Sequence, residues 1–166
     1  MALRDGLLPE FEIEAANTRK VLERVPLDQA DWKPHAKSFS LGALATHTAQ
    51  LMTWTYETLR GDKIDLATGY TPPAIPKTAA ELVARYDGFV QEARTALAAA
   101  TDEQLLGSWS LVNGAQVYFT MPRIACLRSF VFNHAIHHRA QLTVYLRLLD
   151  VPVPGVYGPS ADDPGM

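Results

Sequence analysis

Residues 133–147 read Asn133-His-Ala-Ile-His-His-Arg-Ala-Gln-Leu-Thr-Val-Tyr-Leu-Arg147. They form the centre of an amphipathic pattern that predicts a helix over about 122–149. With about 100° between successive residues, His134, His138 and Gln141 fall on the same stripe as the apolar side chains of this helix. A buried polar group without a hydrogen bond costs roughly 1–3 kcal/mol. Each of these three polar side chains must therefore have a bonding partner within the protein or in a bound ligand.

Three further amphipathic patterns precede this one. They predict helices over about 9–24, 40–60 and 78–100. The third opens with the capping box Thr78-Ala-Ala-Glu81. Asn113-Gly114 predicts a type I′ turn in a small β-hairpin of residues 109–119. The sequence therefore predicts an all-α fold, a four-helix bundle with a small β-hairpin between its third and fourth helices.

The connection of residues 61–77 holds three prolines and two glycines, so it is expected to be a loop. Seventeen residues extend to roughly 55 Å, whereas a helix of 20 residues is about 30 Å long. The loop is thus long enough to cross the bundle, which allows an up-down-down-up order of the helices. A chain of 166 residues suits a single domain over residues 1–166.

Composition narrows the class of protein. The chain has 15 basic and 18 acidic residues, and its net charge of −3 argues against nucleic-acid binding. No run approaches the roughly 20 apolar residues of a membrane span, and the N-terminus turns acidic too early for a signal peptide. We therefore expect a cytoplasmic protein with no membrane partner. The fourth helix carries four arginines and no acid before Asp150, which indicates either an anionic substrate or solvated surface.

Two histidines at i and i+4 on one helix face can bind a single metal ion. His134 and His138 have this spacing, and His47 lies on the apolar stripe of the predicted second helix, from which it can supply a third nitrogen. Three imidazoles around Zn²⁺ leave a fourth position open, as in catalytic zinc sites. Nickel, iron and manganese are the other metals considered. The sequence has no His-Glu-x-x-His, Glu-x-x-His, glycine-rich phosphate loop or Gly-x-Ser-x-Gly motif.

The same histidines have a simpler interpretation, in which each is a core residue satisfied by a hydrogen bond. His137 lies about 60° from His134 around the helix, either beside a substrate or at a helix–helix boundary. Gln141 either makes a core hydrogen bond or orients a bound water, so His137 and Gln141 are the candidate catalytic residues. Arg139 lies off the stripe and is expected in solvent. Cys126 is expected to be a small core residue.

The chain resembles the DinB family of the DinB/YfiT-like bundles over nearly its whole length. The resemblance rests on Asp31-Trp-Lys-Pro-His-Ala-Lys-Ser38, Leu41-Gly-Ala-Leu-Ala-Thr-His47, Phe119-Thr-Met-Pro-Arg123, residues 133–147, Val151-Pro-Val-Pro and Tyr157-Gly-Pro-Ser-Ala-Asp-Asp163. It implies an up-down-down-up bundle, a homodimer, and a divalent metal on His47, His134 and His138. The family often has glycine at the position of Ala140 and glutamate at that of Asp163, and neither change removes a ligand.

The resemblance also implies a class of function. Members of the family include transferases of low-molecular-weight thiols, an isomerase that depends on such a thiol, and hydrolase-like proteins. The first hypothesis is a metal-dependent thiol S-transferase, with zinc or nickel as the favoured metal and a small molecule as substrate. The alternatives are a metal-dependent hydrolase and a non-catalytic metal-binding bundle of a stress response.

Overall fold

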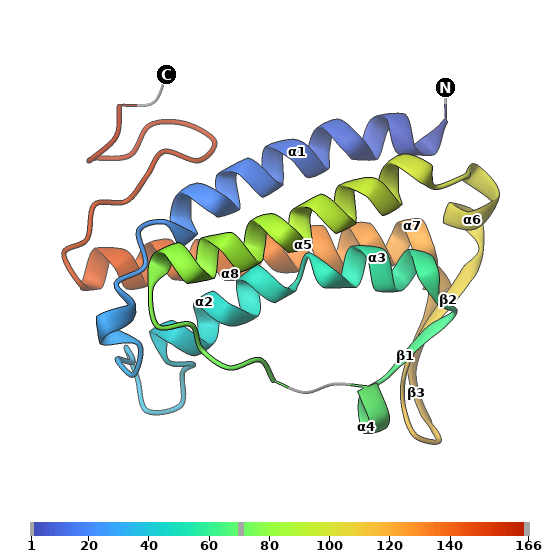
Figure 1. Cartoon of the computed structure of the whole chain (residues 1–166), viewed down its shortest axis with the longest axis horizontal. Helices are drawn as coiled ribbons and strands as arrows, with labels where there is room; N and C mark the ends of the chain where they lie inside the picture. The colour runs from blue at the N-terminus through green and yellow to red at the C-terminus, as the bar shows by residue number, and fades with distance from the viewer. Residues whose placement is uncertain (1, 70–71, 165–166) are drawn as a thin grey trace.

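The structure, a computed structural model, describes residues 2–69 and 72–164. In this part of the chain it is mostly helical, with a three-stranded sheet at one end (Figure 1). Four long helical segments lie side by side: α1 (Leu3–Leu22), α2 with α3 (Leu41–Gln50 and Thr53–Arg60), α5 (Ala79–Ala99), and α7, η2 and α8 in one run (Arg123–Cys126, Leu127–Phe132 and Asn133–Leu148). The short elements are η1 (Leu27–Gln29), α4 (Leu66–Gly69), α6 (Asp102–Leu106), β1 (Lys63–Asp65), β2 (Ser108–Asn113) and β3 (Gln116–Pro122).

The first helix begins earlier than its prediction from Pro9. It starts at Leu3 and encloses Pro9, which lacks the N–H that the helix interior uses. Tertiary contacts stabilise the added turns: the backbone N–H of Leu3 donates to Asp102 at 2.8 Å, and the Arg4 guanidinium donates to the carbonyl of Ala100 at 2.8 Å. Packing against the α5–α6 corner therefore overrides the local preference of proline.

The predicted helix over 40–60 is two helices. Ser40 caps the N-terminus of α2, since its side-chain hydroxyl accepts from the N–H of Ala43. The break falls at Leu51 and Met52, where the N–H of Trp54 donates to the carbonyl of Leu51, three residues earlier rather than four. Both residues at the break are buried, so the kink lies within the core.

The predicted loop over 61–77 contains a strand and a short helix, so the all-α prediction is corrected to a mostly helical fold with a sheet. β1 pairs in parallel with β2, and β2 pairs antiparallel with β3. Ile64 of β1 packs against a small cluster formed by Trp109, Leu111 and Cys126. This packing stabilises a strand within the segment that was predicted to be a loop. A proline-rich segment gave no sign of that tertiary pairing.

The predicted hairpin is present and is longer than expected, but its turn is not type I′. The two-residue loop is Gly114-Ala115, after the end of β2 at Asn113. A type I′ turn needs a positive φ at both central residues. Gly114 has a φ of 58°, and among the described residues Asp150 is the one non-glycine with a positive φ. The Asp65 carboxylate accepts from the N–H of Gly114 at 2.9 Å and ties this turn to β1.

The fourth helical segment contains a π-helical stretch that the sequence pattern did not reveal. Residues Leu127–Phe132 form it, directly before the turn that carries His134. Such stretches are frequent at functional sites. The wider turn changes the angular relation between the residues before it and His134, which a uniform helical period does not describe. None of the helices in the described residues has the length and apolar character of a membrane span.

Candidate metal centre

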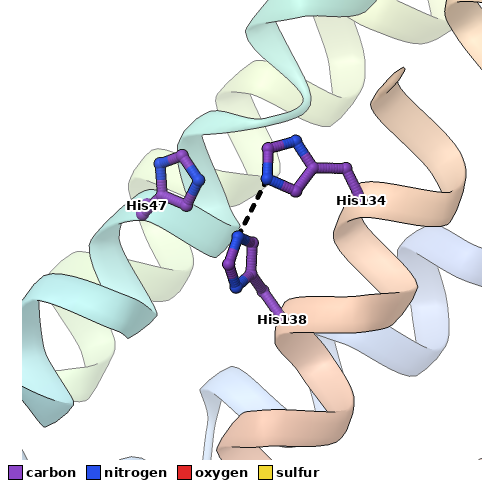
Figure 2. Close-up of side chains that lie close together, drawn as sticks. All are labelled: His47, His134 and His138. Atoms are coloured by element: carbon purple, nitrogen blue, oxygen red, sulfur yellow. Dashed lines mark hydrogen bonds between the residues drawn. The ribbon is translucent and has the colours of Figure 1, made fainter. Parts of the chain in front are cut away.

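Two helical segments bring three imidazole rings together (Figure 2). His47 projects from α2, and His134 and His138 project from successive turns of α8 toward it. Each histidine offers one ring nitrogen, and these three atoms lie within 4.8 Å of one another. The Nε2 atoms of His134 and His138 are 2.9 Å apart. The structure thus assembles the three residues that the sequence singled out as metal ligands.

The core places these rings at the edge of the bundle. His47 lies one turn after Leu44, and His138 lies one turn before Leu142; both leucines are fully buried. Burying these leucines turns the two histidine-bearing faces of α2 and α8 toward each other. His138 is 7% exposed, whereas His47 and His134 are half-buried. The cluster therefore has a buried side and a side that small molecules can reach.

Burial keeps all three imidazoles neutral at pH 7. Burial, followed by repulsion from His138 and His134, lowers the pKa of His47 to about 4. Burial is also the first cause that lowers the pKa values of His134 and His138 below their usual range. A neutral imidazole has a lone pair on one nitrogen, which is the form that binds metals.

Gln141 fixes which nitrogen of His138 faces the cluster. Nδ1 of His138 donates to Oε1 of Gln141 at 2.7 Å, so Nε2 of the neutral ring carries the lone pair and points at His134. Metal-ligating histidines commonly donate their second N–H in this way. Gln141, a candidate catalytic residue from the sequence, thus contacts His138 and orients its ring.

The other candidate, His137, lies outside the cluster. Its ring centroid is 4.9 Å from that of His138, but its side chain is exposed and is not one of the three converging nitrogens. One residue of offset on a helix turns a side chain by about 100°. His137 therefore lies neither among the three rings nor at a buried helix–helix boundary.

The chemistry and spacing of the donors fit a divalent transition metal. Two nitrogens about 2.0–2.1 Å from a tetrahedral Zn²⁺ lie about 3.3 Å apart. His134 and His138 are already near that separation at 2.9 Å, so the longer distances in the group belong to His47. Three neutral imidazoles are a donor set that zinc, nickel and iron accept.

Arg139 is buried, which corrects the expectation that it is solvated. Its side chain is 3% exposed and forms an ion pair with Glu14 of α1 at 2.7 Å. The guanidinium also donates to Thr18 Oγ1 and to the Tyr157 hydroxyl, and Tyr157 donates to Glu14. The periodicity of α8 alone could not show that α1 places the Glu14 carboxylate beside Arg139. The network ties the C-terminal segment to α1 and α8, one residue from His138.

The other arginines of this segment are also paired, and the single cysteine is inert. The ion pairs are Arg123–Asp62, Arg128–Glu10 and Arg147–Asp162. Carboxylates already pair with these guanidinium groups, so the interpretation of the arginines as a site for an anionic substrate loses its basis.

Cys126 is fully buried as expected, and burial raises the pKa of its thiol to about 11.

Aromatic rings around the histidines were missed in the sequence. Phe39 stacks on His47 with ring centroids 6.1 Å apart, and Phe130 meets His134 edge-on at 5.6 Å. Two positional signals were present. Phe39 precedes the Ser40 cap, a position whose side chain packs over the first turns of a helix, and Phe130 lies four residues before His134, on the same helix face.

Comparisons with known proteins agree with this architecture. A crystal structure of a DinB-like protein from Bacillus cereus ATCC 10987 matches with a TM-score of 0.73 and 23% identity, covering 92% of this chain and 97% of that one. A DinB-like protein of Bacillus subtilis, YjoA, matches with a TM-score of 0.68 and 18% identity, covering 87% of this chain and 92% of that one. At these identities, the likeness concerns the fold alone.

Sequence comparison reaches the same family. The uncharacterised protein YrdA of Bacillus subtilis strain 168 is 29% identical over 167 residues, which cover 96% of this chain and 90% of YrdA. The model of the DinB family matches residues 3–165. Because this match spans nearly the whole sequence, the chain belongs to the DinB family.

Proposed function

We propose that His47, His134 and His138 hold a divalent metal ion and that the protein is a metal-dependent thiol S-transferase. The observation that carries the proposal is the convergence of three neutral imidazole nitrogens from α2 and α8 within 4.8 Å. Zinc and nickel are the metals favoured here, with iron and manganese as alternatives, because the group contains imidazoles and no carboxylate in the part of the chain that the structure describes.

His47, His134 and His138 would hold the divalent ion, which would supply a Lewis acid able to lower the pKa of a bound thiol toward neutral. The chain contributes the orientation of its ligands: Gln141 holds the His138 ring, and burial keeps the imidazoles neutral. Cys126 cannot be the sulfur donor, because it is fully buried and its thiol pKa is about 11. The thiol is therefore a separate small molecule.

The overall reaction forms a bond between the sulfur of that thiol and an electrophilic carbon. The bond from that carbon to its leaving atom breaks with both electrons going to that atom: a halide departs, whereas an epoxide oxygen stays attached and takes up a proton. The thiol proton passes to solvent. Hydrolysis at the same site would need a group that takes a proton from water. No carboxylate belongs to the histidine group within the described residues, so thiol transfer is favoured over hydrolysis. The non-catalytic metal-binding bundle is the remaining alternative.

The experiment uses untagged protein. Metal content is measured by mass spectrometry, and conjugation is then assayed with bacillithiol, mycothiol and glutathione against a panel of electrophiles that includes an alkyl halide and an epoxide. We expect one metal per chain and activity with at least one thiol. His134→Ala should lose both. His137→Ala, which removes an exposed imidazole from the same helix, should keep both.

The outcomes separate the alternatives. Metal binding without conjugation, but with cleavage of ester or amide substrates, would favour the hydrolase. Metal binding without any turnover would favour the non-catalytic bundle. An absence of stoichiometric metal would overturn the ligand assignment itself.

The proposal includes the arrangement and setting of the protein. An up-down-down-up order is supported by the directions of the long segments, since α1 and α8 run one way in Figure 1 and α2, α3 and α5 run the other. The family resemblance supports a cytoplasmic homodimer. The net charge of −3 argues against a nucleic-acid partner. Light scattering of the purified protein tests the dimer.

A further inference from the structure

We propose that the reachable side of the histidine cluster binds a flat, apolar group of the substrate, such as an aromatic ring. This inference rests on the proposed metal site and adds the class of substrate. Its basis is an aromatic surface that flanks the three imidazoles on two sides. Phe39 forms one flank, and Phe130 with Trp54 and Phe119 forms the other.

Phe39 is fixed beside the cluster although solvent reaches it. Its ring lies nearly parallel to His47, with an interplanar angle of 27°, and edge-on to His138 at 6.4 Å. The residue is 54% exposed. Its carbonyl accepts from the Tyr145 hydroxyl at 3.3 Å, and the next residue, Ser40, caps α2. The backbone around Phe39 is thus held on both sides, and its exposed face is available to a ligand.

The second flank is a continuous series of rings. Phe130 contacts His134 and also Phe119 and Trp54, with centroid distances of 5.0 and 5.4 Å to the last two. Phe130, Phe119 and Trp54 come from the π-helical stretch, β3 and α3, and all three are half-buried. Aromatic rings 4.5–7 Å apart attract one another and an added ring in offset or edge-on geometry. These three rings therefore form an aromatic surface that begins beside His134 and extends away from the proposed metal ligands, and a planar group of a ligand can pack against it.

Trp54 connects this series to a cavity. It lines a cavity of about 430 Å³ between α3, β1 and α5, together with Ile64 and Phe89 on one part of the wall and the charged side chains of Glu57, Lys63 and Asp65 on another. Ligand pockets commonly measure about 300–1,000 Å³. Gln50, one turn after His47, lines the same cavity, and its Oε1 has no hydrogen-bond partner among the residues that the structure describes. This acceptor would be satisfied by a water molecule or by an N–H or O–H donor of a ligand that reaches it.

The test compares two chelators that differ in one group. Benzohydroxamate and acetohydroxamate bind zinc through the same oxygens, but the first carries a phenyl ring and the second a methyl group. Calorimetry on zinc-loaded protein should give benzohydroxamate an affinity about tenfold higher. In Phe39→Leu and in Trp54→Leu, this ratio should fall to about threefold or less, while the affinity for acetohydroxamate stays within about twofold.

The control is Tyr118→Leu, which removes an exposed aromatic ring from the face of β3 opposite Phe119. It should leave the ratio unchanged. Equal binding of the two probes by the unaltered protein would overturn the aromatic subsite while leaving the metal site in place. Failure of the protein to retain zinc would overturn both, and metal content measured before titration identifies that case.

Discussion

Gln141 Oε1 accepts a hydrogen bond from His138 Nδ1 at 2.7 Å, and this contact sets which nitrogen of His138 faces His134. A neutral imidazole exchanges its donor and acceptor nitrogens at little cost unless a partner selects one form. By accepting at Nδ1, Gln141 leaves Nε2 with its lone pair 2.9 Å from the Nε2 of His134. The glutamine therefore belongs to the proposed metal-binding unit, although it does not supply one of the converging nitrogens.

Replacing Gln141 should weaken metal binding without removing a ligand. In Gln141→Leu the acceptor is lost, and we expect zinc affinity to fall by about 10- to 100-fold. Gln141→Glu keeps an acceptor at the same place and should retain most of the affinity. Competition with a chromogenic chelator measures both. Equal affinity of the leucine variant and the unaltered protein would show that the hydrogen bond does not orient the ligand.

Removing Arg139 should destabilise the fold strongly. Arg139→Ala leaves the Glu14 carboxylate, whose side chain is 12% exposed, buried without its partner. Loss of one member of a buried ion pair costs about 3–5 kcal/mol in the free energy of unfolding. Urea denaturation followed by circular dichroism measures this change.

The matched control is the more exposed pair Arg94–Glu12, whose side chains are 38% and 44% exposed. Arg94→Ala should cost no more than about 1 kcal/mol, because solvent screens such pairs. The double variant Arg139→Met with Glu14→Leu should recover much of the lost stability, since no charge is then buried alone. Similar losses for Arg139→Ala and Arg94→Ala would contradict the importance of burial.

The contrast between Arg139 and the histidines shows how far the sequence leads. His134 and His138 could be placed because helical periodicity within one segment fixes their relation, and His47 because its stripe had to face a neighbouring helix. Arg139 could not be placed, since its burial depends on Glu14, more than a hundred residues earlier. Ile64 was missed for the same reason: its strand exists only through pairing with β2. The relative positions of residues on one helix were predictable, whereas contacts between segments far apart in the sequence were not predictable when no periodic pattern marked them.

Cys126 should react slowly with thiol reagents in the native protein. Its pKa of about 11 leaves about 0.1% of the thiol ionised at pH 8, and the residue is fully buried. We expect labelling with Ellman's reagent to be at least a hundredfold slower than in guanidinium chloride, where burial no longer raises the pKa. Raising the pH toward 10 should speed the native reaction as long as the fold persists. Rapid native labelling at pH 8 would show that the thiol opens to solvent.

Two glycine-to-alanine changes should move stability in opposite directions. A Cβ at Gly42, in the first turn of α2, would lie 2.8 Å from Ala30 Cβ and 2.8 Å from Ile75 Cγ2, so the helix start must shift. Overpacking of this kind costs about 1–3 kcal/mol. A Cβ at Gly88, within α5, meets no atom of the described residues within 4 Å. Alanine there should add about 0.5–1 kcal/mol to the free energy of unfolding, because it restricts the unfolded chain. Thermal and urea unfolding of both variants measure the two opposite changes in stability.

Because Gly42 lies five residues before His47, Gly42→Ala should also lower zinc affinity, whereas Gly88→Ala should leave zinc affinity unchanged. Equal zinc affinity in the two variants would mean that the start of α2 does not position the His47 ligand.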